Sequence, residues 1–183
     1  MERRELFKII AAGALVPSAA AQHAGHGHGA SRGVWTGPLR FFNARQNELV
    51  DRLCEIVLPA DERSPGAHEA GVSYFIDLVL HYDTPEVRGQ WTAGIELVDG
   101  AAQQRFDKPF LACSAGQQDQ LVAAMAEKES DGNDPLGRFF VALKRLTIEG
   151  YYYSEVGLRQ ELGYKGLDTV TEFPGCTHSG HMA

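Results

Sequence analysis

The chain is short of positive charge, and this shortage excludes one class of partner. Its 183 residues carry 17 lysines and arginines against 24 aspartates and glutamates, a formal net charge of −7. Nucleic-acid-binding proteins neutralise phosphate groups with clustered basic side chains, and no such stripe occurs here. We therefore expect no DNA or RNA partner, and no polybasic patch for a membrane surface.

Long hydrophobic runs are missing as well. The only membrane-like run covers residues 9–16, far short of the ~20 residues that a spanning helix needs. The pair Arg3-Arg4 precedes this run, and the small residues 18–21 follow it. This order is typical of a twin-arginine export signal with an Ala-x-Ala cleavage motif that ends at Ala21, so we predict residues 1–21 as an export signal and a periplasmic location. The alternative is an uncleaved amphipathic N-terminal helix.

Cofactor motifs are also absent from the sequence. It contains no glycine-rich dinucleotide loop, no P-loop and no Gly-x-Ser-x-Gly elbow. It has no Cys-x-x-Cys-His for haem and no close cysteine set for an iron–sulfur cluster. We therefore predict no cofactor in this chain. The twin-arginine route suits cargo that folds before export, so the signal needs another explanation.

Segments that alternate apolar and polar residues are absent too, and we predict an all-α domain of about six helices. The capping signals are Asn43, Pro85, Ser114 with Gln117, and Asp134-Pro135. They predict helices over about 44–57 and 68–82, then from 85, from 114, from 135 to Gly150, and over about 154–163. We expect these apolar side chains to be buried together: Phe75, Ile76, Phe139, Phe140 and Leu143.

The two ends of the chain contrast with this helical block. Residues 22–40 are rich in His, Gly and Ala and predict a flexible tether. The domain then covers residues 41–183 and ends in an irregular tail after Gly166.

Five of the seven histidines lie in these ends, namely His23, His26, His28, His178 and His181. Together with Cys176 and Met182 they would suit copper or zinc. One hypothesis is therefore a stand-alone periplasmic metal-binding protein. The other interpretation is that the ends are merely polar and adaptable, because neither has a rigid surrounding that would orient metal ligands. For His68 and His81, at helix ends, we expect surface or capping roles.

Three carboxylates also admit two interpretations. Asp61 and Glu62 in a Pro-Gly loop, with Asp77 on the second helix, could form a general acid–base set of a hydrolase. Alternatively, Asp61 binds backbone amides of its own loop, as aspartate often does in turns.

Three consecutive tyrosines, Tyr151, Tyr152 and Tyr153, follow Gly150. Helical neighbours point about 100° apart, so the three rings cannot all face one core. We predict that at least one ring is exposed, and exposed tyrosine is typical of a protein interface.

Two long stretches resemble a known family. LPADERSPGAHEAGVSYFID (58–77) and FFVALKRLTIEGYYYSEVGLRQELGYKG (139–166) are together similar to gluconate 2-dehydrogenase subunit 3. The ending FPGCTHSGH is also similar, so the resemblance covers residues 41–181. The histidines between 22 and 29 depart from the family's pattern.

The resemblance implies a non-catalytic small subunit of a periplasmic sugar, sugar-acid or polyol dehydrogenase. The implied partner is a large FAD-containing flavoprotein of the glucose-methanol-choline type, and a multihaem cytochrome c with haem c would receive the electrons. On this interpretation the chain escorts the folded, flavin-loaded partner out of the cytoplasm on its own signal. The cofactor that explains the export route then belongs to the partner.

Cysteine is scarce, with three in all. We expect Cys54 to pack in the first helix as a small buried thiol, and Cys113 has no assigned role. Cys176 follows Pro174-Gly175 in the tail, and we predict an intermolecular disulfide with the flavoprotein, with His178 and His181 against that surface. The alternatives are a free thiol or a bridge to Cys113.

Overall fold

The computed structural model describes residues 37–166, and this part of the chain is helical without a strand. Its elements, in chain order, are α2 (Ala44–Val57), α3 (Val72–Tyr82), α4 (Pro85–Phe106), the 3-10 helix η1 (Phe110–Ala112), α5 (Ala115–Glu127), α6 (Pro135–Tyr153) and the π-helical η2 (Val156–Glu161). The all-α prediction is confirmed. The predicted signal and most of the tether lie outside the described residues.

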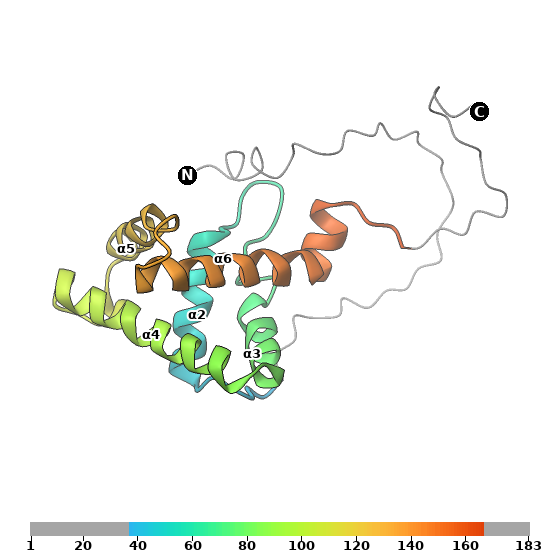
Figure 1. The fold of residues 1–183 in the computed structure, drawn as a ribbon. Helices are drawn as coiled ribbons and strands as arrows, with labels where there is room; N and C mark the ends of the chain where they lie inside the picture. The colour runs from blue at the N-terminus through green and yellow to red at the C-terminus, as the bar shows by residue number, and fades with distance from the viewer. Residues whose placement is uncertain (1–36, 167–183) are drawn as a thin grey trace, which may run out of the picture.

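Helix α6 is the centre of the domain. It contacts α2, α3, α4, α5 and η2, and Figure 1 shows it crossing the body with α4 and α3 below it and α2 upright against it. The short η2 continues from the end of α6 that lies on the same side as α3. Elements far apart in the sequence therefore meet at this end of α6.

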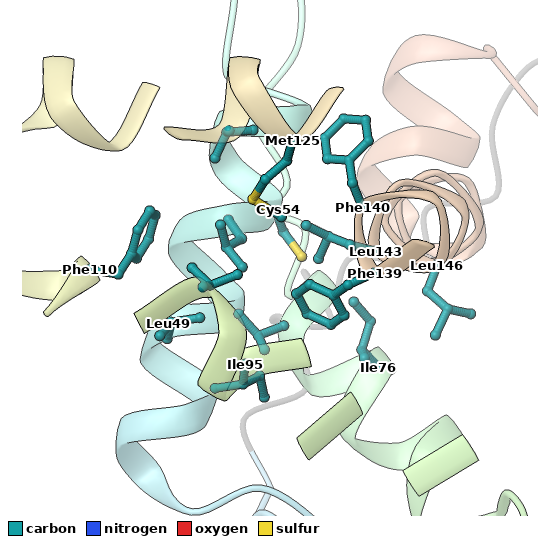
Figure 2. Packing of buried hydrophobic residues seen from close by; sticks show 14 of the residues in the cluster. Leu49, Cys54, Ile76, Ile95, Phe110, Met125, Phe139, Phe140, Leu143 and Leu146 are labelled. Atoms are coloured by element: carbon teal, nitrogen blue, oxygen red, sulfur yellow. The ribbon is translucent and has the colours of Figure 1, made fainter. Parts of the chain in front are cut away.

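Side chains from every α-helix of the described residues meet in one core. Figure 2 shows Cys54 of α2 pointing toward Phe139 and Leu143 of α6, with Ile95 of α4 below them in this view. Of the five apolar side chains predicted to be buried together, four are buried and Phe75 is only partly covered. None of the described helices has the length and apolar character needed to cross a membrane.

Local capping explains where three helices begin. Asn43 and Gln46 form a reciprocal capping box at α2, and Ser114 and Gln117 form another at α5. The Asp134 side chain accepts a hydrogen bond from the Gly137 amide at α6. These caps satisfy amides that have no partner within the helix, and the predicted starts at these three positions are confirmed.

Two predicted helix ends are wrong. The second helix begins at Val72 rather than near 68, because residues 67–71 form turns and Gly71 has a left-handed φ of 69°. The fifth helix continues through Gly150 to Tyr153, so the three tyrosines form its last turn. Gly150 therefore does not stop the helix.

Candidate functional site

A cleft of about 470 Å³ lies between the first part of α3 and the junction of α6 with η2. Much of its lining is apolar or aromatic: Tyr74, Phe75, Leu78, Tyr153, Val156 and Leu158. Charged lining residues are Glu69, Glu155 and Arg159. The cleft is the candidate functional site, because an open hollow with aromatic walls can receive a side chain from another molecule.

Glycine at two positions sets the shape of the cleft. A Cβ at Gly150 would lie 2.6 Å from a ring carbon of Phe75, so glycine lets α6 approach α3 closely. A Cβ at Gly157 would overlap the Tyr151 carbonyl oxygen, so glycine permits the tight turn from α6 into η2. Ser154 fixes this turn, since its hydroxyl donates to the Tyr151 carbonyl at 2.6 Å and accepts from the Gly157 amide at 3.1 Å.

The three tyrosines separate by exposure as helical geometry requires. Tyr151 is fully buried, and its hydroxyl donates to the Pro65 carbonyl at 3.0 Å. Tyr152 is half-buried and donates to Glu161 at 3.0 Å. Tyr153 is 75% exposed and lies beside Phe75 with ring centroids 5.9 Å apart. The predicted exposed ring is therefore Tyr153, whereas Tyr151 belongs to the core. That one or more of the three tyrosines contacts a partner subunit stays a prediction.

The charges around the cleft are mostly negative. Glu155 and Arg159 pair at 3.4 Å, and Glu69 forms no salt bridge with any residue of the described part. Helix α6 ends at the cleft without a basic residue in its last turn. Because the C-terminus of a helix carries partial negative charge, the cleft favours a cation.

The loop between α2 and α3 brings Glu69 to the cleft, and Glu55 of α2 holds this loop. Its carboxylate accepts hydrogen bonds from the amides of Ala60, at 3.1 Å, and His68, at 2.9 Å. A Cβ at Gly66 would overlap the same carboxylate, so glycine lets the loop close over it. Neither contact was predicted from the sequence, and the one local signal was the Pro-Gly pair in the loop.

A family model described as gluconate 2-dehydrogenase subunit 3 matches residues 44–171, which is more than half of the chain. The chain belongs to the gluconate 2-dehydrogenase subunit 3 family. The resemblance stated from the sequence is thereby confirmed, and it makes this chain a subunit of a multisubunit dehydrogenase complex. Comparison with curated proteins and with solved structures found no match.

In this subunit 3 protein, His68 is held at the surface by Asp51. The His68 Nδ1 atom lies 2.5 Å from an Asp51 carboxylate oxygen, and the Ser73 hydroxyl donates to the other oxygen at 3.0 Å. The hydrogen bond to Asp51, and then the charge of that carboxylate, raise the pKa of His68 above its ordinary value. The surface role expected of His68 is confirmed. His81, also exposed, packs edge-on against Tyr82.

Two of the three carboxylates considered as an acid–base set, Asp61 and Asp77, have backbone partners instead, and Glu62 is exposed. Asp61 accepts from the amides of Arg63 and Ser64, each at 2.9 Å, as the turn interpretation predicted. Asp77 is 3% exposed and accepts from three consecutive amides, of residues 40, 41 and 42, at 2.7–3.0 Å. Asp77 therefore fastens the segment before α2 to α3, a function that its position on a helix did not suggest.

The two described cysteines are buried free thiols. Burial raises the pKa of Cys54 to about 12, and the Thr147 hydroxyl lies 3.3 Å from its sulfur, so its predicted packing role is confirmed. Within residues 37–166, no three His, Cys, Asp or Glu side chains are grouped to hold a metal ion. The predicted sites that lie outside these residues are Arg3, Arg4, Cys176, His178, His181 and the tether histidines.

Proposed function

We propose that this chain is the non-catalytic small subunit of a periplasmic FAD-dependent sugar, sugar-acid or polyol dehydrogenase. It escorts the folded flavoprotein subunit through the twin-arginine pathway and stabilises that subunit afterwards. Family membership supports the complex, and the Arg3-Arg4 leader supports the route. The FAD belongs to the large subunit, of the glucose-methanol-choline type, and haem c to a cytochrome that accepts the electrons.

The observation that carries this proposal is the exposed apolar surface at the end of α6. Tyr153, which lines the cleft, is 75% exposed, and Leu162 at 60% and Tyr164 at 43% exposure follow it within twelve residues. Exposed apolar patches on a small domain mark interaction surfaces, and aromatic side chains are enriched at interface centres. A subunit that holds a larger protein needs such a surface.

The tail contributes a covalent contact in this proposal. Cys176 forms an intermolecular disulfide with the flavoprotein in the oxidising periplasm, and His178 and His181 lie against the same partner. Ordering a segment of chain costs about 1–2 kcal/mol of backbone entropy per residue, which packing contacts alone would have to offset. A covalent bridge holds the segment in place without a large contact area.

The test replaces Arg3 and Arg4 with lysine and follows both subunits by cell fractionation. We expect flavin-dependent dehydrogenase activity to remain in the cytoplasm, because the signal that exports the complex is lost. Lys8→Arg, which keeps the charge of the leader outside the arginine pair, is the control and should leave the activity periplasmic. Undiminished periplasmic activity in the twin-lysine variant contradicts the escort role.

A further inference from the structure

The cleft beside α6 joins three properties that point to one kind of occupant. Its walls are aromatic and aliphatic, its Glu69 carboxylate forms no salt bridge with the residues that the structure describes, and α6 ends there with no basic residue in its last turn. An apolar side chain would pack against the walls but would leave the Glu69 carboxylate and the end of α6 without a partner of opposite charge. A cation is attracted by the negative charge of Glu69 and by the partial negative charge at the C-terminus of α6. The faces of the tyrosine rings attract it as well.

The cleft is also pre-formed, which lowers the cost of filling it. The Gly150 contact with Phe75, the Ser154 turn and the loop held by Glu55 fix three of its sides. Tyr153 is supported on one side by the Phe75 ring, 5.9 Å between centroids, while three quarters of its surface is open. A partner therefore finds a rigid aromatic side chain already in position.

We propose, resting on the function proposed above, that this cleft receives an apolar segment of the flavoprotein subunit with a lysine or arginine beside Glu69. The apolar part of the segment packs on Tyr153 and Phe75. The basic side chain lies between the Glu69 carboxylate and the C-terminal end of α6. Arg159 is paired with Glu155 rather than with Glu69.

The first test measures how fast the complex dissociates. A tag on this chain purifies the complex under reducing conditions, so that no disulfide through Cys176 retains the partner, and retained flavin reports the partner over time. We expect Tyr153→Ala to speed dissociation by roughly tenfold or more, the effect of removing an aromatic anchor. Tyr82→Ala is the control, since Tyr82 is equally exposed, at 73%, but does not line the cleft.

Charge reversal tests the cation separately. Glu69→Lys should speed dissociation. Added salt should speed dissociation of the wild type, because it screens the attraction of Glu69 for the partner's cation, and should slow dissociation of the variant, because it screens the repulsion by the new lysine. Glu96→Lys, on the exposed side of α4, is the matched control. Both glutamates are exposed, and unchanged helical circular dichroism shows that each variant folds.

Cross-linking identifies the occupant. Photoreactive p-benzoylphenylalanine in place of Tyr153 should cross-link to a flavoprotein peptide that carries a lysine or arginine, and the same group in place of Tyr82 should not. A cross-link to residues 167–183 of this chain, or to a second copy, overturns the proposal in favour of that occupant.

If no flavin co-purifies with the wild type, the proposed function itself is wrong. If flavin co-purifies and both cleft variants behave like their controls, only this inference is wrong.

Discussion

Several side chains in this domain form long-range hydrogen bonds with backbone groups rather than with other side chains. Asp77 binds three consecutive amides, Glu55 binds two amides of the loop before α3, and Tyr151 binds the Pro65 carbonyl. Buried or closely packed backbone groups need partners, and these long-range side chains supply them where no regular structure does. A helical domain with long connections is thereby kept rigid at its loops.

The His68–Asp51 pair gives a pH dependence whose sign can be worked out. The pKa of His68 is raised in the folded state, so its contribution to stability is full below the ordinary histidine pKa of about 6.5 and is lost as pH rises through the folded pKa. We expect His68→Gln to lower the free energy of unfolding near pH 5.5, with the difference shrinking by pH 8.5. Solvent screens this exposed pair, so the effect should stay within about 0.2–1 kcal/mol.

Urea unfolding at the two pH values measures this difference, and His81→Gln is the control because His81 has no carboxylate partner among the described contacts. A loss in His68→Gln that is as large at pH 8.5 as at pH 5.5 would show that the protonated histidine is not what stabilises the loop.

At the scale of helices, the contact between α4 and α6 depends on one missing side chain. A Cβ at Gly94 would overlap the buried ring of Phe139. We expect Gly94→Ala to destabilise the domain by about 1–3 kcal/mol through overpacking, although alanine favours helix by about 1 kcal/mol. Gly100→Ala, six residues further along α4, meets nothing within 4 Å and should stabilise by up to about 1 kcal/mol.

Thermal unfolding of the two variants measures both effects, because they differ in the sign of the shift in Tm. A rise in Tm for both would mean that Phe139 moves aside without cost.

Helix starts could be predicted from the sequence where the determining contact is local. The caps at Asn43, Ser114 and Asp134 act over three residues, and such signals are readable in one sequence. The start of α3 could not be predicted, because it follows a loop that Glu55 holds from another helix. The prediction that Gly150 stops the helix was wrong. A glycine is required there because a Cβ would overlap the ring of Phe75, which lies 75 positions earlier in the sequence.

The candidate site was predictable only in part for the same reason. That a tyrosine would be exposed follows from helical geometry, but which of the three depends on how α6 lies on the core. The cleft itself joins residues 69–78 with residues 150–159, and no single segment indicates it.

At the scale of the whole molecule, the tail is expected to join the assembly covalently. We predict that non-reducing electrophoresis of the purified complex, with thiols blocked during lysis, gives a band at the combined mass of the two subunits. Reductant should remove this band, and Cys176→Ser should lack it. Cys113→Ser is the control and should keep the band, because Cys113 is buried beside the Lys108 and Pro109 carbonyls. Separate subunit bands from the wild type would rule the bridge out.

The attachment of residues 40–42 to Asp77 also has a mechanical consequence. On the proposed export route, tension applied to the leader travels along the chain until it reaches these three hydrogen bonds, and there it passes sideways into α3. The first load-bearing point of the domain is thus α3, one wall of the cleft, and not the N-terminus of α2. Residues 22–39 allow the leader to extend at most about 60 Å from that point. If a translocase grips the proposed signal, it works within that radius of the domain and pulls first on α3.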